Sequence, residues 1–347
     1  MITVTHPVPF QVIQRTGFQP RDAHVNCAGG PRLGSARVRL AWSADAPPRS
    51  YRLRVSPSGT SGQGPWIELV VRTAGKEQES EVELPAGWYR GELAGTDASG
   101  REVILPVGPF GIGEVYLVAG QSYAANCNDA LVRIDDTDGR VTAMDYRTGA
   151  WRVAHDPQPS VQEPTGSWGT IWPPAMNLLL PMVRVPIGMV NVAVGATASR
   201  EWMPGTPLFA NLLEAGRRAG DFRAVLWQQG ESDVIERIDT AEYTRRIRAM
   251  KTALDDAWGI SRPLLAAKST LHPTVYVEPK AEGAIREAIG QLWRTPGFFP
   301  GPDTDILGGE NRSARGGSEH FTLIGQQRAG QLWFAALWNH LCSLEQG

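Results

Sequence analysis

A serine, a histidine and a glutamine in three separate segments of the chain could supply a nucleophile, a base and an oxyanion donor. Ser122 stands at the turn after the apolar run 114–120 and before a predicted helix. The end of a buried strand exposes such a serine, and a helix N-terminus offers unpaired N–H groups to an oxyanion. A serine hydroxyl is a weak nucleophile and needs a base and oxyanion donors from elsewhere. Gln229, after the apolar run 224–227, and His320, before a C-terminal amphipathic segment, are the candidates.

Three motifs contain these residues: Gly120-Gln121-Ser122, Trp227-Gln228-Gln229-Gly230-Glu231-Ser232-Asp233, and His320-Phe321 followed by Gly325. Together they resemble the SGNH hydrolase superfamily. Within the superfamily they are most similar to the carbohydrate esterase branch of sialate O-acetylesterases and plant-type acetylxylan esterases. A fourth segment, residues 194–205, resembles the Gly-Gly-Thr block of that branch. The resemblance covers about residues 114–340, with the four blocks in the family's order.

The resemblance implies a serine esterase that removes acetyl groups from a sugar or polysaccharide. Ser122 would attack the ester carbonyl, and His320 would accept its proton and return it to the leaving sugar hydroxyl. The backbone N–H groups of Ser122 and Gly195 and the side-chain amide of Gln229 would hold the oxyanion. Two rival functions are a broader SGNH acyl ester hydrolase or acyltransferase, and a degenerate site that only binds glycans.

Three positions depart from the family's pattern. Tyr123 stands where the family usually has Asn after the nucleophile, and Ala196 replaces the second glycine of the Gly-Gly-Thr block. The acid that the family usually has three residues before the histidine is replaced by Gly317. Because of this last change, the motif does not identify the group that orients His320.

Three arrangements could orient His320. Glu319 is adjacent, but neighbours in an extended segment point to opposite sides, so it reaches the imidazole only where the backbone is kinked. Asp303 and Asp305 match a family segment that approaches this loop. A dyad in which a backbone carbonyl orients the imidazole is the third arrangement, and all three satisfy a geometric definition of the triad.

Other residues near the motifs have both a substrate-binding and a structural interpretation. Gln121 and Glu231 are expected beside the substrate, although a carboxylate at the position of Glu231 fits a helix cap equally well. Residues 126–172 are a predicted insertion with four tryptophan or histidine positions and several acids beside the nucleophile. It is either a substrate-contact wall or a solvated insertion with packed tryptophans.

Composition excludes several other classes of function. A formal net charge of −2 gives no electrostatic case for nucleic acid or an anionic membrane as partner. Cys-x-x-Cys, His-x-x-x-His and Walker spacings are missing, so we expect no metal and no cofactor. Cys27, Cys127 and Cys342 are too few for a disulfide framework and are expected to be reduced.

No signal peptide or long apolar run is visible, which predicts a soluble protein, cytoplasmic by default, or secreted or periplasmic if a leader was removed. The sequence does not indicate an oligomeric state.

A change of apolar spacing near residue 112 predicts two domains. In residues 1–112, period-two alternation between turns rich in Gly, Pro, Ser and Asp predicts a small antiparallel β-sandwich, with Trp88, Tyr89 and Phe110 as candidates for its core. Its expected strands are 36–42, 51–55, 67–72 and 81–84.

In residues 113–347, short apolar runs alternate with helical periodicity. The expected strands are 115–119, 189–194, 224–227 and 263–267, and the expected helices are 207–219, 240–258, 279–293 and 322–341. This order predicts an SGNH-type α/β/α catalytic domain with a doubly wound parallel sheet. Ser122, Gly195 and Gln229 each follow a predicted strand, so they should meet at the carboxyl edge of the sheet.

Overall fold

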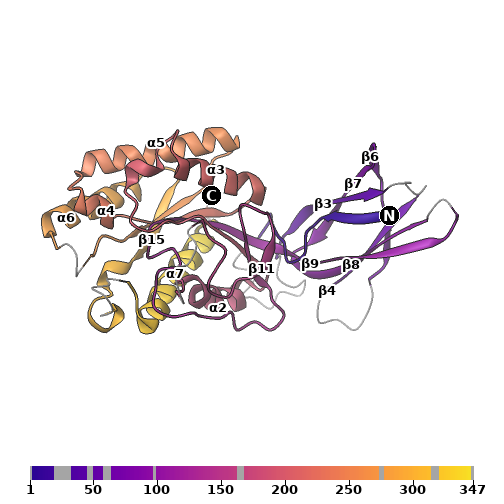
Figure 1. Ribbon diagram of the computed structural model, residues 1–347, viewed down its shortest axis with the longest axis horizontal. Helices are drawn as coiled ribbons and strands as arrows, with labels where there is room; N and C mark the ends of the chain where they lie inside the picture. Colours follow the sequence, from indigo (N-terminus) through magenta and orange to yellow (C-terminus); the bar gives the residue numbers. More distant parts are fainter. Residues whose placement is uncertain are drawn as a thin grey trace.

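The computed structural model describes residues 2–18, 33–44, 50–57, 64–96, 99–161, 168–272, 277–313 and 320–344. It confirms the expected mixed α/β architecture with one large sheet. Helices pack on the sheet at one end of the molecule, and the described part of the other end consists of strands and loops (Figure 1). Glu319, Gly317 and Cys27 lie outside the described residues.

The central strands of the large sheet are mostly buried. Across the sheet the strands are β11 (Trp151–Val153), β10 (Val141–Met144), β12 (Ile187–Asn191), β9 (Glu102–Gly120), β13 (Ala224–Gln228), β14 (Leu264–Lys268) and β15 (Phe298–Asp303). Neighbours are parallel from β10 to β15, while β11 pairs with β10 antiparallel. Strands β12, β9 and β13 therefore end at the same carboxyl edge, where α/β sheets bind ligands.

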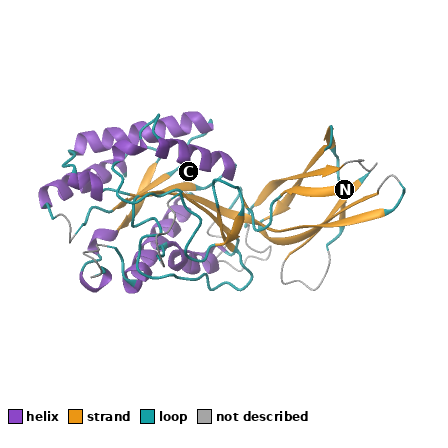
Figure 2. Cartoon of the chain, in the orientation of Figure 1, coloured by secondary structure: helices purple, strands orange, loops and turns teal. Residues whose placement is uncertain are grey.

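Helices cover both faces of this sheet (Figure 2). On one face lie α3 (Pro207–Ala219), α5 (Thr240–Trp258) and α6 (Pro279–Leu292), and on the other lie α2 (Trp172–Val183) and α7 (Leu323–Ser343). Side chains of β9 alternate between them: Val115 and Leu117 pack towards the first group, Tyr116 and Val118 towards the second. Shorter helices are α4 (Glu231–Ile235), η1 (Ser199–Trp202), η2 (Thr304–Ile306) and η3 (Gly309–Asn311).

The strands of the N-terminal part form two groups. The first is the antiparallel sheet β1 (Ile2–His6), β3 (Ser35–Ala44), β7 (Glu77–Pro85) and β6 (Arg72–Ala74). In the second, β5 (Trp66–Glu68) pairs with β4 (Tyr51–Pro57), β4 with β8 (Gly87–Thr96), and β8 with the first half of β9, while β2 (Val12–Gln14) runs parallel to β9. One apolar cluster, which includes Trp42, Tyr51 and Phe110, contains side chains of both groups. Tyr89 is also in it, whereas Trp88 packs in the core of the large sheet.

Strand β9 passes without interruption from the N-terminal strands into the large sheet. Just past residue 112, fully buried Glu114 forms ion pairs with Arg15 Nε (2.7 Å) and Arg223 Nε (2.7 Å). Burial alone would raise the pKa of Glu114, but Arg223 and Arg15 outweigh it and hold the pKa at about 2. The junction of the two parts therefore contains a buried charge network.

Two local predictions about secondary structure are wrong. The expected strand 67–72 is split into β5 and β6, with residues 69–71 outside both. The insertion 126–172, for which no strands were predicted, contains β10 and β11, which extend the large sheet. No helix follows Ser122: residues 121–127 form turns, in which the N–H groups of Ala124 and Ala125 bond back to Gln121 O.

Candidate active site

The turn after β9 presents Ser122 between two buried neighbours. Gln121 is 3% and Tyr123 is 1% exposed, while Ser122 is half-buried. Gly120 has a φ of +126°, and a Cβ there would lie 2.1 Å from Gln228 O. Only glycine can therefore take the strand into this turn without displacing β13. Since no helix begins here, helix N-terminal N–H groups are not available to an oxyanion at this turn.

Backbone hydrogen bonds bring the ends of β12 and β13 against this turn. Val194 N donates to Gly120 O (3.0 Å), and Gln121 N donates to Gln228 O (2.9 Å). Ser122, Gly195 and Gln229 each stand within two residues of these bonds. The three loops that the sequence places at one edge therefore meet there in the structure.

The side chains of Gln121 and Gln229 are buried beneath the loops at the carboxyl edge of the sheet and bond to each other. Gln121 Oε1 accepts from Gly230 N (3.4 Å), Ser232 N (3.2 Å) and Gln229 Nε2 (3.3 Å). Gln229 is 0% exposed, and its Nε2 also donates to Thr197 O (3.1 Å). An oxyanion role for Gln229 stays a prediction, and it requires the amide to exchange one of these acceptors for the substrate.

Asp233 is a buried residue of this cluster for which the sequence indicated no role. Its carboxylate accepts from Ser199 N (2.7 Å), Ser199 Oγ (2.5 Å) and Gln229 Nε2 (2.5 Å), with Arg246 Nη1 at 3.6 Å. Asp233 thus fixes the loop after β12, which contains Gly195, to the start of α4. Asp233 belongs to the quoted motif, but its contact with Ser199 spans 34 residues and has no local signal.

Glu231 opens α4 and is fully buried. Ser269 Oγ donates to its Oε1, and its Oε2 is buried without a hydrogen-bond partner among the described residues. Burial, with a smaller contribution from Asp305, raises its pKa to about 8, although the hydrogen bond from Ser269 opposes this. Glu231 is therefore a neutral carboxylic acid at neutral pH, able to donate a hydrogen bond, rather than an exposed helix cap.

The segment of His320 is bonded to the turn that follows Ser122. Phe321 N donates to Asn128 Oδ1 (3.2 Å), and Asn128 Nδ2 donates to Tyr123 O (3.2 Å). The chain continues this pairing, because Asp129 N donates to Phe321 O (3.0 Å). Asn128 therefore joins the two predicted catalytic segments, a role that its sequence position does not reveal.

Tyr123 packs directly against His320. The two rings meet edge to face with centroids 5.7 Å apart, and Tyr123 Oη donates to Leu271 O (2.9 Å). The guanidinium of Arg312 lies 4.6 Å from the Tyr123 ring centroid and 4.3 Å from that of Phe321. The tyrosine that replaces the family's asparagine thus packs against the imidazole, and Arg312, which the sequence did not single out, places a positive charge over the rings of Tyr123 and Phe321.

The two aspartates proposed as alternative acids have other partners. Arg286 binds Asp303 through both terminal nitrogens (2.8 and 2.5 Å) and Asp305 through Nη1 (2.5 Å). Asp305 also accepts from Thr270 N (2.7 Å) and Leu271 N (3.0 Å). Asp305 therefore anchors the loop after β14 and Asp303 pairs with α6, and a role of either in orienting His320 would come in addition.

Comparison with protein families identifies the class to which this fold and site belong. Residues 112–338 match the model of the family described as carbohydrate esterase, sialic acid-specific acetylesterase. The chain belongs to this family, which confirms the resemblance and supports hydrolytic esterase activity. The described residues contain no group of three His, Cys, Asp or Glu that could hold a metal ion, and no helix suited to crossing a membrane.

Individual proteins are also similar to this chain. A probable carbohydrate esterase of Arabidopsis thaliana is 34% identical over 102 residues, which are 27% of this chain and 39% of the relative. A carbohydrate acetylesterase from Xanthomonas citri superposes with a TM-score of 0.55 at 16% identity, over 99% of this chain and 75% of that one. A structure from Arabidopsis thaliana has a TM-score of 0.51 at 19% identity, over 66% of this chain and 99% of that one. These two structural similarities show a shared fold.

Proposed function

We propose that the protein is a carbohydrate O-acetylesterase that uses Ser122 as nucleophile and His320 as general base. The observation that carries this proposal is the convergence of three strand-end loops and the His320 segment around the Ser122 turn, held by the bonds of Gly120, Gln228 and Asn128. The proposal that the substrate is a carbohydrate is supported by the description of the family.

The reaction would proceed in two steps. Ser122 Oγ attacks the acetyl carbonyl carbon while His320 takes its proton, and the sugar oxygen leaves with that proton. Water then attacks the acetyl-serine through the same base and releases acetate. The N–H of Ser122, which has no acceptor among the described residues, and that of Gly195 would stabilise the oxyanion.

The proposal is tested by covalent labelling. An organophosphonate should label the wild type at Ser122 stoichiometrically, Ser122→Ala should form no adduct at this position, and His320→Ala should label at least about 100-fold more slowly. Intact-protein and peptide mass spectrometry locate the adduct. Acetate release from acetylated xylo-oligosaccharides and from acetylated sialic acid then identifies the sugar. Absence of any adduct on the wild type would reject the serine mechanism.

We further propose that residues 1–112 form a β-sandwich domain separate from the catalytic domain of residues 113–347. The two antiparallel groups of strands and the cluster around Trp42 support this division. Amides of β3 and β7 should then open with a different free energy from those of β12 and β13 in native-state hydrogen exchange. Identical opening free energies would indicate one cooperative unit.

A further inference from the structure

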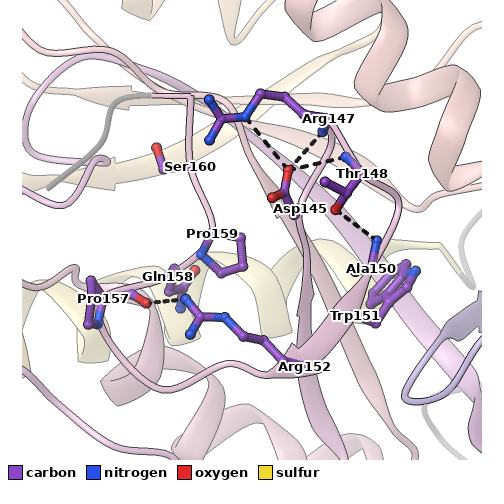
Figure 3. A pocket seen from close by; sticks show the side chains of 10 residues that line it. All are labelled: Asp145, Arg147, Thr148, Ala150, Trp151, Arg152, Pro157, Gln158, Pro159 and Ser160. Carbon is purple, nitrogen blue, oxygen red and sulfur yellow. Dashed lines mark hydrogen bonds and ion pairs between the residues drawn. The ribbon is translucent and has the colours of Figure 1, made fainter.

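A pocket with a volume of about 360 Å³ lies between the β10–β11 turn and the segment of residues 157–160 (Figure 3). Polar and charged side chains gather around it. They include Asp145, Arg147, Arg152, Gln158 and Ser160. The proposed reaction of Ser122 uses none of these residues.

The pocket lies at the same edge of the sheet as Ser122. Asp145 directly follows β10, and β10 is separated from β9 by β12 alone, with all three strands parallel. Two strand spacings and the longer reach of β9 place the pocket on the order of 10–20 Å from the Ser122 turn. Asn126 links the two, since its Nδ2 donates to Gln158 O (2.9 Å) and its Oδ1 accepts from Gln158 N (3.0 Å). The pocket is thus within reach of a neighbouring unit of an oligosaccharide bound at Ser122.

The charged side chains of the pocket have a positive balance. Its lining has two arginines and one aspartate, a net charge of +1. Arg147 and Arg152 lie on either side of Pro159 (Figure 3), and Arg147 Nε is 3.9 Å from Asp145 Oδ1, which offsets part of its charge. Arg152 Nη2 donates to Pro157 O (2.6 Å), which fixes the guanidinium and leaves it further donors. Guanidinium groups bind carboxylates with paired hydrogen bonds.

Two buried oxygens of the pocket are unsatisfied. Among the described residues, neither Gln158 Oε1 nor Ser160 Oγ has a hydrogen-bond partner, and Gln158 is only 2% exposed. A buried polar atom without a partner costs about 1–3 kcal/mol. Both oxygens lie beneath the pocket wall, so the surface that a ligand meets is formed by the other polar groups of the lining.

We propose that this pocket is a saccharide subsite for a carboxylated sugar, a uronate-type unit, in the same oligosaccharide as the acetyl ester. The inference rests on the proposed function, because it assumes that the acidic sugar is linked to the sugar unit whose acetyl ester is hydrolysed at Ser122. The arginines, Arg152 above all, bind the carboxylate. The subsite would favour esters on acidic oligosaccharides over those on neutral ones.

Direct binding tests this subsite without requiring catalysis. A deacetylated, uronate-bearing xylo-oligosaccharide is titrated calorimetrically into the wild type, the double variant Arg147→Gln/Arg152→Gln, and each single variant. The matched control is Arg133→Gln, an exposed arginine of the same insertion outside the pocket lining. The comparison ligand is the same oligosaccharide with its carboxyl group reduced to an alcohol. Melting temperatures establish that every variant is folded.

The wild type and Arg133→Gln should bind the acidic ligand equally, and the double variant should bind it at least about tenfold more weakly. The reduced ligand should bind the wild type as weakly as the acidic ligand binds the double variant. Equal affinity of the wild type for both ligands, unchanged affinity of the double variant, or no binding at all would overturn the subsite. Hydrolysis of 4-nitrophenyl acetate by the wild type reports separately on the proposed function, so the two failures are distinguishable.

Discussion

Glu231 shows how strongly burial changes the chemistry of a single residue. Its pKa rises from 4.5 to about 8, so between these values the folded chain keeps a proton that the unfolded chain has released. The stability linked to this proton is complete below pH 4.5 and is lost as the pH rises through about 8. The carboxyl is therefore a source of instability in alkaline solution.

We expect Glu231→Gln to remove that pH dependence. The amide keeps an acceptor for Ser269 and does not ionise, so the variant should gain melting temperature relative to the wild type between about pH 5 and about pH 9. Differential scanning calorimetry across this range measures the difference. A constant gap between the two proteins would show that Glu231 is already ionised in the folded chain.

Gln229→Ala distinguishes an oxyanion donor from a structural amide. The change removes a buried donor to Asp233 and Thr197 and should cost about 1–3 kcal/mol of unfolding free energy as well as lowering kcat. Urea denaturation and steady-state kinetics measure the two effects. A loss of roughly 100-fold or more in kcat with unchanged stability would instead assign the amide to the oxyanion.

At the scale of elements, the end of β9 depends on one glycine. We expect Gly120→Ala to prevent folding or to lower the melting temperature sharply, because φ is +126° and the new Cβ would overlap Gln228 O at 2.1 Å. Gly283→Ala in α6 is the matched control, since no atom lies within 4 Å of its Cβ position and alanine favours a helix. Soluble expression and thermal melts compare them; a stable Gly120→Ala protein would contradict the assigned turn.

Elements with strong local signals could be predicted from the sequence. Helix α3 begins at Pro207 after the Thr206 cap. Helix α5 begins after the Asp239 cap and is followed by Gly259, its C-cap residue, in the left-handed conformation. Both match their predicted bounds. Helix α2 has no side-chain cap and contains Pro181 in its interior, so its local sequence gives no clear helix signal, although prolines in its first turn are compatible with a helix.

For the candidate site as well, some features could be predicted from the sequence and others could not. Motifs at strand ends indicated which loops would meet, because the carboxyl ends of parallel strands share an edge. The side chains that hold the loops together could not be predicted: Asn128 meets Phe321 across 193 residues, and Asp233 meets Ser199 across 34. Such contacts are set by packing of the whole domain and have no local signature.

For the whole molecule, the Glu114 network is a point where a single charge affects both parts. Glu114→Gln leaves Arg15 and Arg223 without their counter-charge and should cost about 3–5 kcal/mol of unfolding free energy at neutral pH. The wild type loses this advantage as the pH falls from 4.5 towards about 2, so the gap should narrow in acid. Urea denaturation at neutral pH and at about pH 3 measures it.

The control is Glu79→Gln, which removes a surface pair with Arg39 at 3.2 Å and should change the unfolding free energy by less than about 1 kcal/mol. Equal effects of the two substitutions would mean that burial of the Glu114 network contributes nothing.

The continuity of β9 also limits how this chain can be rearranged in evolution. A recombination event that joined residues 113–347 to a different leading module would break one strand in the middle and separate Arg15 from Glu114. Swaps should therefore succeed only when they carry the donor's entire β9 and its Arg15 equivalent. We therefore expect shuffled hybrids with a junction inside this strand to be insoluble.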